Sequence, residues 1–341
     1  MTHDAQVQKP TQKLIAETAG LSVGTVSRAL AGDPKIADAT RRLVGQIAAE
    51  LGYAPDRAAQ RLRTGKTQVI NLILPPHDEI FGFGTSLIRG ITRGLEDSNY
   101  HLVVMPDFGP DVTRDDPGEV ITRIVKNRLA DGILFSRTEP NDARVRFLTE
   151  TGFPFVSHGR TEGKHTHAFV DYDNTNFAYK SAVRMIQKGA RKLSILLPPP
   201  TLTFRQHLLQ GITNAVREYN VELEVFNGAT LDNSADQIEA AIRHRFAAPD
   251  RPDGLVLPGE VSGLATLAAL QDIGLTPQKD VQLVVKQTTG LFDLVRPRVD
   301  CIFEDLPEAG LQMARLLLRR LRGEAPETLH YVQPISSANL Q

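Results

Sequence analysis

Apolar positions follow two rhythms along this chain of 341 residues. Between residues 11 and 53 they recur every three or four positions, which is the spacing of short amphipathic helices. From residue 69 onward, short apolar runs alternate with longer stretches of helical periodicity. The change of rhythm predicts a small all-α domain followed by a larger α/β domain.

Residues 11–30, TQKLIAETAGLSVGTVSRAL, predict two short helices joined by a tight turn. Gly20 permits the positive φ that ends the first helix. Ser22 can accept a hydrogen bond from the free amides of the second helix, which is expected over residues 23–30. The apolar positions of the first helix recur at helical spacing and are Ile15, Ala16 and Ala19.

Small Ala16, then Gly20 and then Val26 have the spacing of a DNA-binding helix-turn-helix. An ordinary helical hairpin has the same pattern and is commoner, so these twenty residues leave both interpretations open. A third helix is predicted over residues 37–51. Its apolar residues are expected to stack at i, i+4 and i+8: Leu43, Ile47 and Leu51.

Residues 54–67, APDRAAQRLRTGKT, have the composition of a basic linker with a short helix at 56–62. Beyond them, the series of strands and helices predicts parallel sheets covered on both faces, arranged as two doubly wound lobes. Ligands of such lobes bind beyond the carboxyl ends of the strands. The expected strands are 69–74, 101–105, 132–136, 153–158, 168–172, 193–197, 222–226, 254–257, 281–285, 299–303 and 329–332.

Composition is ordinary for a soluble globular protein, with 41% hydrophobic and 23% charged residues. No apolar run is long enough to span a bilayer, and the N-terminal residues lack the apolar core of a signal peptide. The single cysteine, Cys301, fits a reducing cytoplasm and lies in an apolar run. We therefore expect a cytoplasmic protein with a buried, inert thiol and not a nucleophile.

Charge is distributed unevenly. Residues 1–66 contain 10 Lys and Arg against 6 Asp and Glu, whereas the rest of the chain contains 29 against 34. A basic N-terminal segment attached to an acidic body suits a nucleic-acid-binding module joined to a domain with another task.

Five motifs together resemble the LacI/GalR family of bacterial regulators: TVSRAL, AGDP, LGYAPD, RLRTGKT and ADGILF. The resemblance implies an all-α helix-turn-helix DNA-binding head, a hinge helix and an α/β two-lobed core like that of periplasmic binding proteins. The corresponding segments are 1–53, 54–67 and 68–336. The first lobe would hold about 68–166 and 299–323, and the second about 167–298 and 324–336.

In this family the second helix lies in the major groove, where all four base pairs can be distinguished. The positions matching base-contacting residues are Val23, Gly24 and Arg28. The positions matching phosphate contacts are Thr11, Lys13, Thr25 and Ser27. Because Val23 and Gly24 replace polar residues of the family pattern, direct readout is expected to depend on Arg28.

Leu62 matches the family's hinge leucine, which wedges between base pairs in the minor groove. An apolar residue between Arg61 and Arg63 also suits a site rimmed by phosphates. The alternative is a leucine packed on the partner hinge or on the core. Ala59 is small enough for paired hinge helices to approach closely.

The resemblance also implies effector contacts in the cleft between the lobes. Arg160, in the motif SHGR, matches an arginine that binds sugar hydroxyls through its planar fork of donors. The other matching or substituting positions are Phe83, Asp173, Phe204, Arg205, Glu260 and Gln287. For each of them, the competing interpretation is a helix cap or a surface ion pair.

Other chemistries fit the sequence less well. Gly82 and Gly84 follow a strand as in a nicotinamide-binding fold, but Leu87 occupies the place of the third glycine. His158, His165 and His167 match no standard metal-ligand spacing, and a solvated loop is the simpler interpretation. Motifs of metalloproteases, serine hydrolases and Walker-type NTPases are missing from the sequence, so we expect neither an enzyme nor a bound cofactor.

The sequence thus predicts a cytoplasmic homodimeric repressor that binds pseudo-palindromic operator DNA and a small effector, with no membrane partner. We expect a sugar or glycoside, such as a disaccharide, because arginine, carboxylates and aromatic rings suit a polyhydroxylated ligand. A regulator that responds to a nucleobase, or a cytoplasmic solute-binding protein, is the alternative.

Overall fold

The computed structural model describes residues 10–54, 61–62, 64–74, 82–107 and 118–335. Contacts between residues divide the chain into two compact units, with the boundary between Thr67 and Gln68. Each unit is therefore considered by itself. Within the described residues, none of the helices is both long and apolar enough to cross a membrane.

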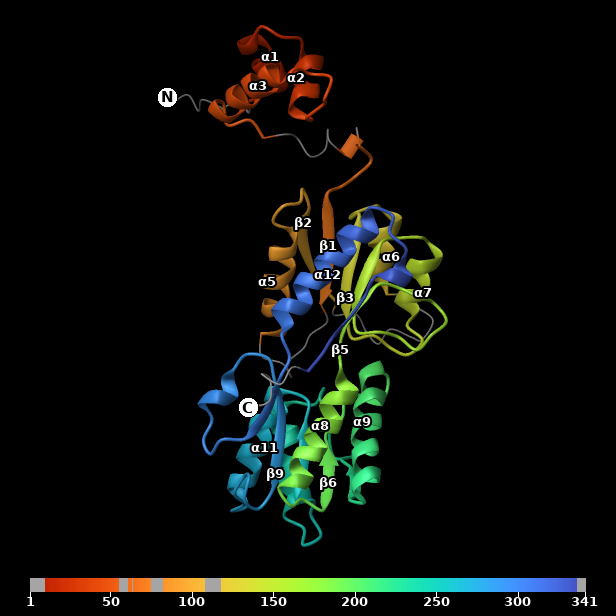
Figure 1. Cartoon of the computed structure of the whole chain (residues 1–341), viewed down its shortest axis with the longest axis vertical. Helices are drawn as coiled ribbons and strands as arrows, with labels where there is room; N and C mark the ends of the chain where they lie inside the picture. The colour runs from red at the N-terminus through yellow and green to blue at the C-terminus, as the bar shows by residue number, and fades with distance from the viewer. Residues whose placement is uncertain (1–9, 55–60, 63, 75–81, 108–117, 336–341) are drawn as a thin grey trace, which may run out of the picture. The chain divides into compact units, whose positions relative to one another are not determined.

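In residues 10–54 of the first unit, the helices α1 (Gln12–Ala19), α2 (Val23–Leu30) and α3 (Asp38–Glu50) pack together in Figure 1. The predicted turn between α1 and α2 is confirmed. Gly20 has a φ of 67° and ends α1, while the Ser22 hydroxyl accepts a hydrogen bond from the Thr25 amide at 3.1 Å. Two adjacent caps thus fix the angle between the helices.

One small apolar core holds these three helices together. Ala16 of α1 and Val26 of α2 are both buried in it, as their spacing predicted. The expected stack on α3 needs correction, because Leu43 is 45% exposed and Val44 is buried in its place. The buried face of α3 consists of Val44, Ile47 and Ala48.

Little of the expected hinge helix lies within the described residues. Arg61, Leu62 and Thr64 have helical backbone geometry, and the Leu62 side chain is 89% exposed. Ala59 and the other residues of 55–60 lie outside the described part of the chain.

The second unit begins with a sheet of six parallel strands in the spatial order β11-β5-β4-β3-β1-β2. Figure 1 shows α5 (Phe83–Leu95) and α12 (Leu306–Leu321) side by side against this sheet, and the two helices share one apolar core with it. The helices α6 (Glu119–Lys126) and α7 (Ala143–Glu150) share a second, separate core with the sheet. Alternate strand residues feed these two cores, as expected for a sheet covered on both faces. The strands are β1 (Val69–Leu74), β2 (His101–Pro106), β3 (Gly132–Ser136), β4 (Phe155–His158), β5 (Phe169–Tyr172) and β11 (His330–Gln333).

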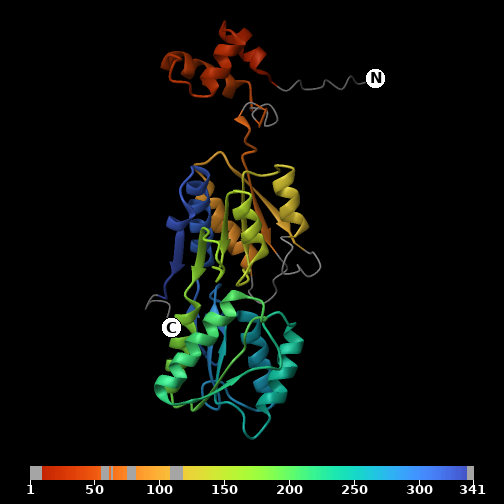
Figure 2. The same ribbon diagram turned by 90° about the vertical axis from the view of Figure 1, so that its right-hand side faces the viewer.

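A second parallel sheet has five strands in the order β10-β9-β8-β6-β7. The helices α8 (Asn174–Gln187) and α9 (Thr203–Tyr219) share one core with it and lie beside each other in Figure 2, while α10 (Ala235–Phe246) and α11 (Glu260–Asp272) share another. The strands are β6 (Lys192–Ile195), β7 (Glu222–Val225), β8 (Gly254–Leu257), β9 (Gln282–Gln287) and β10 (Asp300–Phe303). Two short 3₁₀ helices, Leu291–Leu294 and Pro326–Thr328, complete the described elements.

The strand pairing corrects the expected lobe boundaries. β5 and β11 belong to the first sheet, and β10 pairs with β9 in the second. The first lobe therefore contains β5, α12 and β11, and the chain crosses between the sheets after Tyr172 and again after Phe303. The structure also contains α7, a helix that the sequence analysis did not predict between the third and fourth strands.

Candidate ligand cavity and nucleic-acid interface

One face of α2 is suited to contact nucleic acid. Val23 is 46% exposed, Gly24 and Arg28 are exposed, and the three lie on adjacent turns. The Arg28 Nε donates a hydrogen bond to the Gly24 carbonyl oxygen at 3.3 Å, which leaves the terminal nitrogens at the helix surface. Short apolar and cationic groups on one exposed helix face can meet base edges and phosphates together.

The other predicted contacts of this unit lie around the same helix pair. The Thr11 hydroxyl caps α1 by accepting from the Leu14 amide at 3.2 Å. Lys13 is exposed and lies 4.0 Å from Glu17, and the Thr25 hydroxyl is 2.9 Å from that of Ser22. Ser27 is half-buried on α2. The structure thus places these groups on α1 and α2, and their contacts with DNA stay a prediction, as do those of Leu62 and Ala59.

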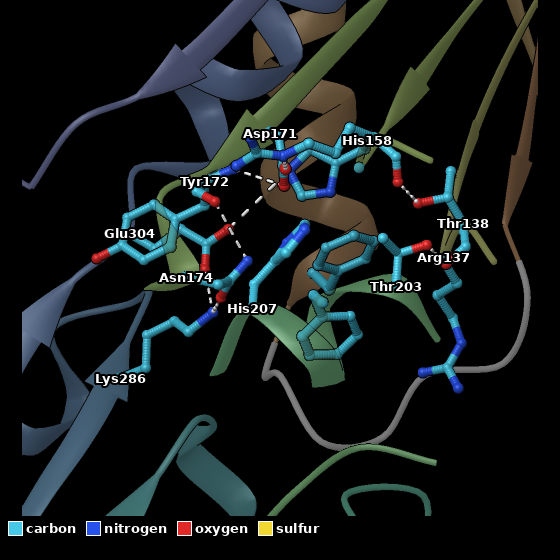
Figure 3. A pocket seen from close by; sticks show the side chains of 14 residues that line it. Arg137, Thr138, His158, Asp171, Tyr172, Asn174, Thr203, His207, Lys286 and Glu304 are labelled. Carbon is cyan, nitrogen blue, oxygen red and sulfur yellow. Dashed lines mark hydrogen bonds and ion pairs between the residues drawn. The ribbon is translucent and has the colours of Figure 1, made fainter. Parts of the chain in front are cut away.

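A cavity whose empty volume, with the open solvent at its mouth included, is about 560 Å³ lies within the second unit, at the carboxyl ends of strands from both sheets (Figure 3). This is the position that the doubly wound topology predicts for a ligand. Its walls come from residues at or after the ends of strands, together with the first turns of α5, α8 and α9. They are Phe83, Arg137, Thr138, His158, Gly159, Arg160, Asp171, Tyr172, Asn174, Thr203, Phe204, His207, Lys286 and Glu304.

Arg160 is held by its neighbours on the first lobe. Its Nε donates to the Asp171 carboxylate at 2.6 Å, and the other carboxylate oxygen accepts from the Tyr172 amide at 2.9 Å. The Thr138 hydroxyl donates to the main-chain oxygen of Arg160 at 2.8 Å. The guanidinium is therefore oriented without using its terminal nitrogens, for which no partner exists among the described residues.

Lys286 and Glu304 form a buried ion pair at 3.0 Å, and both side chains are about 95% hidden from solvent. Lys286 comes from β9 and Glu304 follows β10. The Lys286 ammonium also donates to the Asn174 side-chain oxygen at 2.8 Å, toward which it points in Figure 3. It lies 4.8 Å from the centre of the Tyr172 ring as well. These contacts satisfy the ammonium and link the second sheet to the crossovers that follow β5 and β10.

His158 ends β4 beside this pair. Its ring meets that of Phe83 edge to face with centroids 5.8 Å apart, and Nε2 lies 4.0 Å from the Glu304 carboxylate. Burial lowers the pKa of His158 below its ordinary value, although Glu304 and Asp171 act in the opposite direction. Burial therefore favours the neutral imidazole, in which one nitrogen donates and the other accepts.

A seam of direct contacts joins the lobes on another side of the cavity. The Thr138 carbonyl oxygen accepts from both the amide and the hydroxyl of Thr203, at 2.9 and 3.0 Å. His207 Nε2 lies 2.9 Å from the Glu162 carboxylate. Arg137 pairs with Asp232 of the second lobe. A ligand in the cavity would therefore be in contact with groups that also determine how the lobes meet.

Arg144 supports the turn that carries Arg137 and Thr138. It donates to the Arg137 carbonyl oxygen at 2.8 Å, pairs with Asp142 at 2.7 Å and lies over the Phe135 ring at 4.5 Å. Burial alone would raise the pKa of Asp142, but the charge of Arg144 and the hydrogen bonds from Arg144 and the Glu139 amide together hold the pKa below its ordinary value. The pair holds Arg137 at a φ of 59°, an uncommon conformation for a residue with a side chain.

The structure brings Phe83, Arg160 and Phe204 together in the cavity wall, as the resemblance implied. It places four other candidates elsewhere, and each has a partner that explains its position. The Asp173 carboxylate caps α8 by accepting from the Asn176 amide at 3.0 Å. Arg205 donates to the Pro198 carbonyl oxygen.

The remaining two candidates are buried beneath the second sheet's strand ends. Glu260 is fully buried, and its two carboxylate oxygens accept from the amides and hydroxyls of Thr288 and Thr289 at 2.7–3.1 Å. Gln287 is 4% exposed and donates to Asp293 at 3.3 Å. These hydrogen bonds fix the loop after β9, so both side chains have structural tasks.

Several cavity residues were missed by the sequence analysis, although their positions carried a signal. His158, Asp171, Lys286 and Glu304 all lie in the last two residues of a strand or directly after one. That rule, applied to every predicted strand, would have found them. Among the described residues, no group of His, Cys, Asp and Glu could hold a metal ion. Cys301 is buried as expected, and burial raises its pKa to about 12.

Comparisons with known proteins agree with both units. Residues 11–56 match the family model for bacterial regulatory proteins of the lacI family, and residues 182–337 match that of a periplasmic binding protein-like domain. The chain is 30% identical over 329 residues to the HTH-type transcriptional regulator AglR of Rhizobium meliloti (strain 1021), covering 92% of this chain and 89% of that protein.

Two solved structures are similar in fold. The lac repressor dimer bound to operator and the anti-inducer ONPF has a TM-score of 0.81 at 17% identity and covers 96% of this chain and 97% of its own. The complex of the transcriptional regulator CelR with cellobiose has a TM-score of 0.66 at 24% identity, and 98% of each chain is covered.

Proposed function

The chain belongs to the lacI family of bacterial regulatory proteins, and from this premise we propose that a sugar in its cavity controls how tightly its first unit binds operator DNA. It is a DNA-binding transcriptional regulator with a helix-turn-helix. We propose that it acts in the cytoplasm as a homodimer, so that two α2 helices meet the two halves of a pseudo-palindromic operator.

The cavity at the strand ends of both lobes is the observation that carries the proposal. Arg160 offers hydrogen-bond donors, Glu304 offers an acceptor, and the His158 ring offers one donor and one acceptor. This combination suits hydroxyl groups, because a hydroxyl both donates and accepts hydrogen bonds. Phe83 and Phe204 supply apolar surface for the face of a sugar ring. Among proteins of this fold, CelR has been solved with cellobiose, a disaccharide, and this supports a sugar as the ligand class.

Control of DNA binding follows from a difference in affinity between two arrangements of the lobes. A ligand that contacts the crossover residue Glu304 and the seam residue Thr203 binds one arrangement better than the other. If the two arrangements hold the paired hinge segments differently, bound sugar lowers the affinity for operator DNA. Bound operator DNA then lowers the affinity for sugar by the same factor.

The test starts from operator sequences selected by the purified protein from random DNA. Neutral sugars, polyols, nucleobases and amino acids are then screened for a rise in melting temperature and for release of the selected DNA. We expect a sugar to do both. Release by a nucleobase and not by sugars would contradict the proposed ligand class, and failure to select any DNA sequence would contradict the proposed DNA target.

Arg160→Ala sharpens this test. Without the donors of Arg160, the sugar should no longer release the operator, while operator affinity in the absence of sugar stays unchanged. Arg217→Ala is the matched control, since Arg217 is an exposed arginine of α9 that does not line the cavity. Equal sugar affinity in the two variants, measured by calorimetry, would leave Arg160 a structural role only.

A further inference from the structure

We propose that the effector is an uncharged sugar and that the cavity rejects phosphorylated and acidic sugars, because the charges in its wall are already paired within the protein. This inference rests on the proposed function and narrows it to one class of ligand. A basic cavity between the lobes would otherwise suit a sugar phosphate equally well.

In the part of the chain that the structure describes, three cationic side chains line the cavity, and each has a carboxylate partner. Arg160 pairs with Asp171 at 2.6 Å and Lys286 with Glu304 at 3.0 Å. Arg137 pairs with Asp232, which lies in the second lobe outside the wall. Among the described residues, the wall together with Asp232 therefore has no surplus positive charge to offer an anion.

Lys286 is the cation most removed from use by a ligand. Its ammonium contacts Glu304, Asn174 and the faces of Tyr172 and Phe177, and only 5% of its side chain is exposed. Turning it toward a phosphate would leave the Glu304 carboxylate buried and unpaired. Separating a buried ion pair in this way costs more than a new contact returns, so we assign Lys286 to the architecture of the crossovers.

The groups that remain suit hydroxyls and not phosphate. Among the described residues, no hydrogen-bond partner exists for the terminal nitrogens of Arg160, for either ring nitrogen of His158 or for Oε1 of Glu304. A hydroxyl both donates and accepts, and can satisfy all three. A phosphate or carboxylate only accepts, and it would repel Glu304 and Asp171 while its own charge lost water.

Calorimetry on the full-length protein compares matched pairs of probes: trehalose with trehalose 6-phosphate, sucrose with sucrose 6-phosphate, and glucose with glucose 6-phosphate and glucuronate. The neutral member of any pair that binds should be at least about tenfold tighter. Equal or tighter binding of the charged member would overturn the inference and leave the proposed function standing. Operator binding without response to any sugar, neutral or charged, would contradict the proposed function itself.

Two variants test the charge argument directly. Asp171→Asn and Glu304→Gln keep the shape of each side chain but leave Arg160 or Lys286 unpaired. In each, the affinity for the phosphorylated probe relative to its neutral partner should rise by at least about tenfold. Melting curves identify the variant that folds, and either one suffices for the comparison.

The matched control is Asp300→Asn. Asp300 pairs with Arg184 at 2.8 Å in the second lobe and does not line the cavity, so its loss also exposes cationic charge, but away from the ligand. The ratio of affinities should stay at the parent value. A folded Asp171→Asn or Glu304→Gln variant with the same ratio as Asp300→Asn would show that wall charge does not select the ligand, and the inference would fail.

Discussion

Arg28 supplies the long charged side chain on the exposed face of α2. On the same face, Val23 offers only a small apolar side chain and Gly24 has no side chain. Arg28→Ala should therefore remove a base contact and cost about 1–3 kcal/mol at one operator position in each half-site. Binding to operators substituted position by position measures the effect. If the variant still distinguishes operator from random DNA as the parent does, the assignment is wrong.

Lys13→Ala provides the contrast for Arg28. Lys13 is exposed on α1 and is assigned to phosphate, so its loss should weaken binding to all sequences alike. The slope of log affinity against log salt concentration should also fall by about one unit. A sequence-specific defect in this variant would move Lys13 from the phosphate group to the base-reading group.

The buried histidines His158 and His167 predict acid sensitivity. Burial lowers the pKa of each below its ordinary value of 6.5, so the folded chain favours the neutral rings. In the unfolded chain both rings protonate as the pH falls below 6.5, and the stabilisation present above that pH is then lost. The melting temperature of the second unit should be lower near about pH 5.5 than near about pH 7.5.

His167→Phe isolates one ring from this effect, because His167 lies between Phe155 and Phe169 at centroid distances of 5.7 and 5.8 Å. An aromatic ring without a titratable nitrogen should fill the same space and flatten the pH dependence. The substitution also removes one of the two hydrogen-bond partners of the Ser157 hydroxyl, which still donates to the Gly159 carbonyl oxygen, so the comparison uses the slope with pH and not the absolute melting temperature. A slope equal to that of the parent would exclude His167 as a source of acid sensitivity.

The sequence predicted the structural role of an individual residue only where that role depends on neighbouring residues in the chain. Ser22 caps α2 and Gly20 takes a positive φ because both tasks depend on the adjacent residues. Arg160 lines the cavity because it lies two residues beyond the carboxyl end of β4. Lys286 and Glu304 could not be paired in advance, since their contact depends on how β9 and β10 align in the sheet.

At the scale of elements, the crossing of α5 and α12 is the tightest contact in the first lobe. A Cβ on Gly90 would lie 1.9 Å from the Pro307 carbonyl oxygen, so the two helix backbones touch. Gly90→Ala must push the helices apart and should destabilise the second unit by about 1–3 kcal/mol or more. Thermal or denaturant unfolding of the parent and the variant, both without effector, measures this loss of stability.

Gly84→Ala is the matched control on the same helix. Among the described residues, its Cβ would meet only the tip of the Leu74 side chain, at 3.2 Å, which can move aside. Its effect should be close to neutral, because alanine also reduces the freedom of the unfolded chain. Equal losses in both variants would mean that the backbone contact at Gly90 does not determine the stability of the crossing.

The order of helices and strands was largely predictable, whereas their assignment to lobes was not. Apolar runs predicted each of the eleven strands in the described part of the chain, including the largely exposed edge strand β2 and the edge strand β7, which has no fully buried residue. α7 was missed because its sequence, ARVRFLTE, is charged and offers a weak apolar face. β5, β10 and β11 were assigned to the wrong lobes because only hydrogen bonding between strands distant in sequence decides which sheet receives them.

At the scale of the whole molecule, the lobes are joined in two ways that a ligand can influence together. Covalent crossovers pass through Tyr172 and Glu304, and the non-covalent seam includes Thr138 and Thr203. All four residues line the cavity. An effector bound in this cavity would therefore act on both connections at once, which is what a two-state element between ligand and DNA requires.

A substitution of Leu62 tests whether the rearrangement of the lobes changes DNA binding through the hinge segment. The Leu62 side chain is 89% exposed between Arg61 and Arg63, an unusual place for a leucine unless another surface covers it. If the hinge orders only when two subunits lie on an operator, its ordering cost must be offset by contacts made there. A leucine inserted between base pairs supplies apolar burial and lets the duplex bend.

Leu62→Ala should therefore weaken operator binding and reduce operator bending, with little change in non-specific binding, which depends on phosphates. Sugar affinity without DNA should stay the same, because Leu62 does not line the cavity. If Leu62 instead packs on protein, the variant melts at a lower temperature without DNA and binds all sequences less tightly. Operator affinity, random-DNA affinity and melting temperature, measured on this one variant, separate the two. A destabilised protein with unchanged operator preference would exclude the wedge, since loss of a DNA contact cannot lower the stability of the free protein.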